Sequence, residues 1–151
     1  MNVVYTPAEL LADRLRKAAA ADPELFAVSE HDCSRIATLR KSGKAARLDQ
    51  LLANGAWTDA ALTMLAMELP GWTLRRLVHE DDEWICSLSQ QPNLPSNLDD
   101  TVDFNHSVLP VAILGALTEA RARASACLPR AQSVPEVMAR PVHVACCDNF
   151  A

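Results

Sequence analysis

The order of signals from Trp57 to Ala124 constrains the fold of this chain more than any other feature. A capped apolar helix is followed by two short strands that carry aromatic residues, and then by a second long apolar helix. Helices packed on an antiparallel sheet make an α+β fold. We therefore predict an α+β protein in which residues 56–125 form an αββα core unit with a small antiparallel sheet.

Two further regions flank this unit. Residues 1–55 carry several helix signals, among them a capping box of Thr6 and Glu9 and a second helix start at Asp22. Residues 126–151 contain three prolines among small and polar residues, which is typical of a mobile tail. The predicted organisation is an N-terminal helical region, the core unit and a C-terminal tail.

The two predicted strands lie on either side of an acidic segment, residues 80–82, and both alternate apolar and polar residues with a period of two. A three-residue loop at this segment would pair Val78 with Trp84 and bring Trp72 and Trp84 to one face of the sheet. Asp82 is the loop residue best suited to a left-handed conformation. We therefore predict a hairpin with an odd-numbered loop.

The segment from Gln90 to Asn105 has the composition of a loop, and Ser107 is expected to cap the long helix that follows it. The predicted sheet then has only two strands, which are marginally stable alone and leave two open edges. We therefore expect a second strand source, and predict pairing with a second copy or another protein along an edge strand.

The charge of the chain argues against nucleic-acid binding. The formal net charge is -5 and the isoelectric point is near 5.3, whereas affinity for a phosphate backbone comes mainly from Lys and Arg. The basic residues from Arg40 to Arg47 flank a glycine turn between two helices, an order that superficially resembles a helix-turn-helix DNA reader. We interpret them as solvated residues at a turn.

A cytoplasmic location is expected from the start of the chain and from its cysteines. The N-terminal segment lacks a basic region followed by a long apolar one, and no window approaches the roughly 20 apolar residues of a membrane span. The five cysteines are odd in number and have no framework spacing. We expect free thiols and no membrane association.

Two clusters offer candidate metal ligands. His143, Cys146 and Cys147 combine imidazole and thiolate ligands and form a candidate site for zinc or copper, although a second ligand pair at conventional spacing is missing. The acidic run at 80–83 lacks the spacing of a calcium loop and is interpreted as a wet hairpin tip. Cys33 beside His31 is interpreted as a helix start. We assign no catalytic residue and no cofactor.

Arg76 interrupts the apolar face of the first predicted strand. A cation there needs an acidic partner, an aromatic ring such as Trp72 or Trp84, or access to solvent at an interface. These three residues are the candidate interaction site.

Residues 55–91 (GAWTDAALTMLAMELPGWTLRRLVHEDDEWICSLSQQ) and 109–124 (LPVAILGALTEARARA) carry a resemblance. With the GW that opens the hairpin, the tryptophan of the return strand and the LPVAI helix start, this stretch resembles uncharacterised, mostly alpha-proteobacterial proteins. Its layout is similar to that of phage-associated ABA sandwich domains. The resemblance implies a fold and no catalytic residues.

The leading functional hypothesis is a non-enzymatic interaction or regulatory domain that self-associates through a sheet edge or a helix face. The alternative is a metal- or redox-responsive protein that uses His143, Cys146 and Cys147. An enzyme stays a third possibility, because catalytic groups converge in space without leaving a sequence motif.

Overall fold

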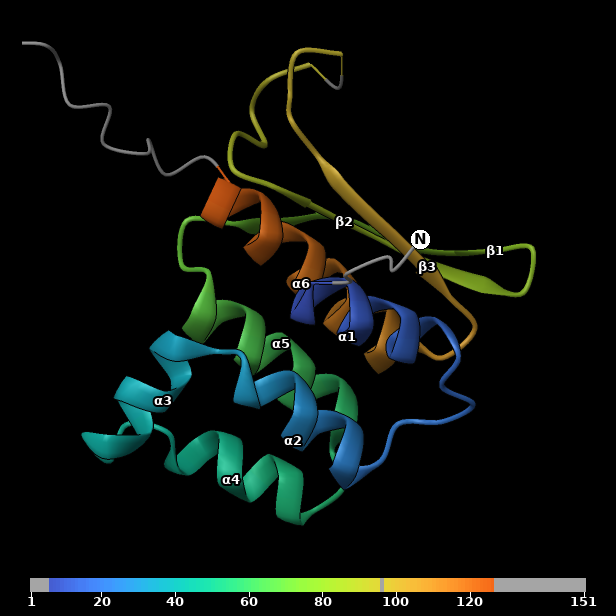
Figure 1. Ribbon diagram of the computed structural model, residues 1–151. Helices are drawn as coiled ribbons and strands as arrows, with labels where there is room; N and C mark the ends of the chain where they lie inside the picture. Colours follow the sequence, from blue (N-terminus) through green and yellow to red (C-terminus); the bar gives the residue numbers. More distant parts are fainter. Residues whose placement is uncertain (1–5, 96, 127–151) are drawn as a thin grey trace, which may run out of the picture.

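The computed structural model describes residues 6–95 and 97–126 (Figure 1). Within them the chain forms six helices and one three-stranded antiparallel sheet, which confirms the predicted α+β class. The helices gather on one side of the sheet, and the hairpin between its first two strands projects away from them (Figure 1).

Four short helices precede the core unit: α1 (Pro7–Arg16), α2 (Pro23–His31), α3 (Ser34–Lys41) and α4 (Ala46–Ala53). The capping box at α1 is present as predicted, because the Thr6 side chain accepts from the Glu9 N–H while Glu9 reaches back to the Thr6 N–H. Asp22 caps α2 in the expected way, with its carboxylate accepting from the Leu25 N–H at 2.7 Å. The first two helix starts are therefore encoded locally.

The core unit consists of α5 (Trp57–Glu68), β1 (Thr73–Glu80), β2 (Glu83–Ser89), β3 (Val102–His106) and α6 (Leu109–Ala126), with β2 in the middle of the sheet. The strand β3 corrects the expectation that residues 90–105 are all loop. Val102, Phe104 and His106 are buried while Asp103 and Asn105 are exposed, the alternation of a half-buried strand. The additional strand that the two-stranded hairpin was expected to need is therefore β3 of the same chain.

The hairpin register also differs from the predicted one. Asp81 and Asp82 form a two-residue turn with φ values of 50° and 64°, the pattern of a type I′ turn, and Glu80 pairs with Glu83. Trp84 consequently lies opposite His79 rather than Val78. The expected left-handed Asp82 is confirmed, but Asp81 is left-handed too, so the loop is even-numbered.

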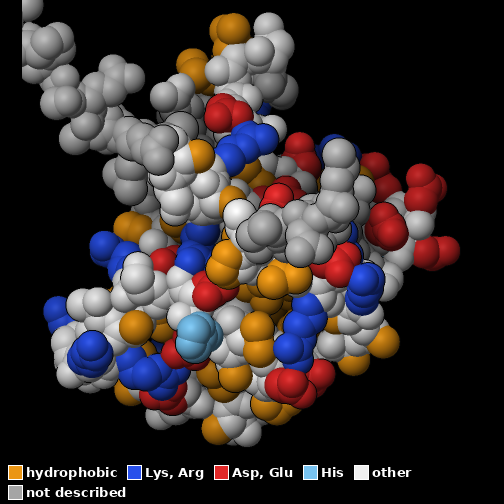
Figure 2. All heavy atoms as spheres, in the orientation of Figure 1, with side chains coloured by type: hydrophobic (Ala, Val, Ile, Leu, Met, Phe, Trp, Pro, Cys, Tyr) orange, Lys and Arg blue, Asp and Glu red, His pale blue; other side chains and the backbone are white. Residues whose placement is uncertain are grey.

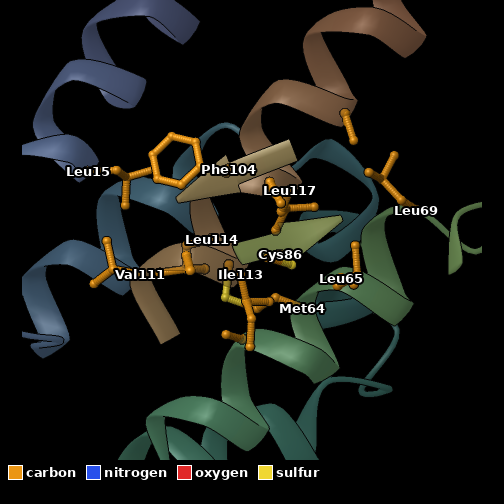
Figure 3. Packing of buried hydrophobic residues seen from close by; sticks show 14 of the residues in the cluster. Leu15, Met64, Leu65, Leu69, Cys86, Phe104, Val111, Ile113, Leu114 and Leu117 are labelled. Carbon is orange, nitrogen blue, oxygen red and sulfur yellow. The ribbon is translucent and has the colours of Figure 1, made fainter. Parts of the chain in front are cut away.

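One hydrophobic cluster contains residues from the N-terminal helices and from the core unit (Figure 3). Residues 110–118 and Ala120 of α6 are buried on all sides, because α6 packs between α1, α5 and the sheet. Phe104 on β3 lies beside Leu15 of α1 (Figure 3), and its ring also covers Gly115 of α6. Helix and sheet can approach this closely because position 115 has no side chain.

The connection between β2 and β3 is fixed by two arginines from neighbouring elements. Arg75 of β1 pairs with Asp99, whose side chain is only 1% exposed and also accepts from the Ser89 hydroxyl at 2.8 Å. Arg123 of α6 pairs with Asp100 and donates to the Thr101 carbonyl. Asp99 belongs to the segment expected to be loop, yet its carboxylate is buried and has two partners.

Candidate functional site

The end of the β1–β2 hairpin carries four acidic residues in a row. Glu80, Asp81, Asp82 and Glu83 are all exposed, and Figure 2 shows acidic side chains gathered where the hairpin projects in Figure 1. The four residues follow one another around a tight turn, so their carboxylates spread into solvent rather than converge. The tip is therefore a local negative charge at the end of a protruding arm.

A β-bulge in β1 places the adjacent residues Arg75 and Arg76 in different surroundings. The pairing of β1 with β2 shifts between Leu74 and Arg76, so Arg75 is the extra residue. Arg75 turns to the buried Asp99, whereas Arg76 lies on the outer face of the sheet and pairs with Glu80 at 2.7 Å, with both side chains about half exposed. The sequence singled out Arg76 and missed Arg75, because period two alone cannot locate a bulge.

The outer edge of β1 offers unpaired backbone groups. A two-residue turn makes Glu80 and Glu83 a hydrogen-bonded pair, and such pairs alternate along an antiparallel ladder. The N–H and C=O groups of Leu77 and His79 therefore point away from β2. Among the described residues, no backbone hydrogen bond outside the β1–β2 ladder involves residues 76–80. This edge can accept another strand.

The structure does not bring the three predicted interaction residues together. Trp72 precedes β1 and is buried in the hydrophobic cluster, while Trp84 is half-buried near the opposite end of the hairpin, with its ring 4.9 Å from that of His79. Trp84 is on the face of the sheet turned towards the helices, and Arg76 is on the other face. Of the three, Arg76 alone belongs to the open edge.

A buried polar cluster at the start of α3 was missed by the sequence. Glu68 at the end of α5 accepts from the N–H groups of Arg35 and Ile36, both at 3.0 Å, and lies 3.6 Å from Arg121 of α6. Arg121 also donates to the Asp32 carbonyl. A carboxylate in the last turn of a helix is disfavoured by the helix dipole, so Glu68 in that place was the available signal. The cluster caps α3.

The two cysteines of the described residues are free thiols, as expected. Both are buried, and burial raises the pKa of Cys33 and of Cys86 to about 12. The Cys33 thiol donates to the Ser29 carbonyl at 3.2 Å, while the neighbouring His31 side chain is turned out to solvent. Neither thiol can serve as a nucleophile near neutral pH, because nucleophilic attack requires the thiolate.

The predicted metal ligands His143, Cys146 and Cys147 lie outside the described residues. Within residues 6–95 and 97–126, no group of three or more His, Cys, Asp or Glu side chains is placed to hold a metal ion. The acidic run at 80–83 lies at the turn between β1 and β2 and forms no such group.

A hollow of about 740 Å³ lies between α1 and the second half of α6. Its lining includes small side chains such as Ala12 and Ala122, and charges already engaged with one another, including Arg16 with Glu119 at 2.9 Å. A pocket that binds a small molecule usually offers polar groups free to fix the ligand's orientation. The ion pair between Arg16 and Glu119 leaves neither side chain free for that role.

Comparison of the chain with models of protein families, with curated proteins and with solved structures finds no match. In the part of the chain that the structure describes, no helix has the length and apolar composition of a membrane span.

Proposed function

We propose that this chain is a non-enzymatic interaction domain that self-associates through the outer edge of β1. The observation that carries the proposal is the position of this strand. The outward N–H and C=O groups of Leu77 and His79 have no partner among the described residues, and α6 packs over β2 and β3 and leaves β1 at the margin of the sheet. A strand in this position is suited to β-strand addition.

The composition of the edge supports a selective partner. Arg76, His79 and Glu80 are exposed, and charged side chains with a bulge protect edge strands from indiscriminate pairing. Such an edge pairs stably only with a strand that places opposite charges across from its own.

The chemistry of the remaining described groups supports an interaction role over catalysis. The two thiols are buried, and the most deeply buried carboxylates, Glu68 and Asp99, are committed to a helix cap and to an arginine. Groups with these structural partners are not available for proton transfer to a substrate.

The test is a comparison of two substitutions at His79 in the full chain. His79→Pro removes an N–H that points away from β2 and is tolerated on an edge strand, whereas His79→Ala removes the same ring and keeps the N–H. We expect wild type and His79→Ala to show a concentration-dependent monomer–dimer equilibrium in sedimentation velocity, from about 1 to 500 µM. His79→Pro is expected to stay monomeric.

Circular dichroism and urea unfolding of dilute samples establish that both variants are folded. A monomeric wild type across the whole concentration range would overturn the proposal. A dimer that His79→Pro leaves intact would also overturn it, and would place the contact on another surface, such as a helix face.

A further inference from the structure

The outer face of β1 carries a basic, an apolar and an acidic residue at alternate positions: Arg76, Val78 and Glu80. Resting on the proposed self-association, we infer that the partner strand is β1 of a second copy, paired antiparallel about Val78. In this arrangement Arg76 of each copy binds Glu80 of the other.

The backbone permits this register. Between the bulge and the turn, the outward N–H and C=O groups belong to Leu77 and His79, as the two-residue turn requires. Pairing Val78 with Val78 of the second copy sets Leu77 of each copy opposite His79 of the other, so outward groups face outward groups on both sides of the two-fold axis. If the register were shifted by one residue, the outward N–H and C=O groups of one copy would lie opposite residues whose N–H and C=O groups are already bonded to β2.

The charges select this register among those that the backbone allows. Antiparallel pairing about Val78 sets Arg76 and Glu80 directly opposite each other twice, at the close spacing of a non-hydrogen-bonded pair. Within one copy the same two side chains already form an exposed ion pair at 2.7 Å. Dimerisation exchanges the two pairs within the copies for two pairs between them, so no charge has to be left without a partner.

The acidic tips do not oppose the arrangement. Asp81 of one copy lies six positions along the ladder from Asp81 of the other, which is about 20 Å at a rise of about 3.3 Å per residue. That distance exceeds the Debye length of about 8 Å at physiological ionic strength. Each tip instead lies beside the arginine-bearing end of the other hairpin.

The helices leave room for the second copy. α6 covers β2 and β3, so in a continuous six-stranded sheet both copies of β1 separate one set of helices from the other. On the helix side of the sheet, His79 of one copy meets the half-buried Leu77 of the other, next to Trp84. The pairing therefore covers apolar surface as well as backbone groups.

Charge reversal tests the register. In an Arg76→Glu dimer, the new glutamate of each copy faces Glu80 of the other. In a Glu80→Arg dimer, the new arginine of each copy faces Arg76 of the other. Each variant alone is therefore expected to raise the dimer dissociation constant by about tenfold or more. Mixed in equal amounts, the two variants place Glu opposite Arg at both positions. We expect the mixture to form a one-to-one heterodimer with an affinity near that of wild type.

Rescue by mixing has no explanation within one chain, because residues 76 and 80 of each variant still carry like charges. Lys44→Glu, an exposed reversal on the turn between α3 and α4, is the matched control and should leave the dimer unchanged. Sedimentation velocity of one fluorescently labelled variant reports the heterodimer.

A cross-link provides a readout that does not depend on charge. Under oxidised glutathione, Val78→Cys is expected to form a disulfide between residues 78 of two copies, identified by peptide mass spectrometry. Arg76→Cys should not link to itself, because its counterpart in the second copy is Glu80.

The outcomes separate the two proposals. A dimer that His79→Pro abolishes but that neither charge reversal weakens, with no 78–78 cross-link, would overturn the register and leave the edge association standing. A wild type that is monomeric throughout would overturn both. Rescue by mixing together with the 78–78 cross-link would establish the paired β1 strands.

Discussion

The ring of Phe104 on β3 lies against the backbone of Gly115 on α6, so that any side chain at position 115 would overlap the ring. Gly115→Ala should therefore lower the free energy of unfolding by about 1–3 kcal/mol, the range for overpacking a core. The change opposes the gain of about 0.5–1 kcal/mol that alanine brings to a helix interior. Urea unfolding measures the difference.

The control for Gly115→Ala is the same substitution in a Phe104→Leu background. There the smaller side chain leaves space for the new methyl group, and the penalty should shrink or change sign. A stabilised Gly115→Ala protein in the wild-type background would contradict the close packing of β3 on α6.

Arg75 and Arg76 offer a comparison of adjacent residues with opposite surroundings. Asp99→Ala removes the buried partner of Arg75 and of the Ser89 hydroxyl, and should cost about 3 kcal/mol in the free energy of unfolding. Arg76→Ala removes an exposed ion pair and should cost less than about 0.5 kcal/mol in dilute samples. Comparable losses in the two variants would contradict the bulge that divides them.

Because Glu68 of α5 caps the N-terminus of α3, we predict that Glu68→Gln is destabilising. Its carboxylate accepts from two backbone N–H groups and neighbours Arg121, so the neutral amide should cost about 1–3 kcal/mol. Glu24→Gln, at an exposed pair with Arg14, is the matched control and should change stability by less than about 0.5 kcal/mol. Both are measured by thermal and urea unfolding.

The buried thiols predict a loss of stability at alkaline pH. Cys33 and Cys86 have a pKa of about 12 in the folded protein, against about 8.5 in an unfolded chain. Below pH 8.5 both states keep the protons, and between pH 8.5 and 12 only the unfolded state loses them. Stability should therefore fall as pH rises through this window, by up to about 1.4 kcal/mol per pH unit and thiol.

Urea unfolding under reducing conditions at several pH values from 7.5 to about 10 measures this slope. Cys33→Ala lowers stability at pH 7.5 through lost packing, but should show a shallower decline with pH than wild type. Equal slopes in the two proteins would show that Cys33 ionises as easily in the folded state as in the unfolded one.

The sequence predicted those parts of the fold that depend on local signals. Thr6 and Asp22 start helices where their side chains reach the first-turn N–H groups, and the apolar period locates α5, α6 and the hairpin. It missed β3, because the five residues from Val102 to His106 follow a stretch rich in proline, asparagine and aspartate. The alternation was present, but it was too short to outweigh that composition.

The candidate site was less predictable, because its geometry depends on the position of the β-bulge and on the length of the hairpin turn. A single extra residue at the bulge turns Arg75 inward and Arg76 outward, and an even-numbered turn decides which backbone groups face the free edge. The sequence pattern identified Arg76 as unusual but assigned it to an apolar face. Residues held by distant partners, such as Glu68 and Asp99, carry no periodic signal at all.

The dependence of α3 on Glu68 has a consequence for the order of folding. An eight-residue helix is unstable alone, and the residue before its first turn, Cys33, provides no side-chain hydrogen bond to that turn. Its first N–H groups find their acceptor more than 30 residues later, at the last position of α5. In hydrogen exchange, α3 should therefore become protected only after α5 is in place, so that a helix early in the chain is among the last elements to become ordered.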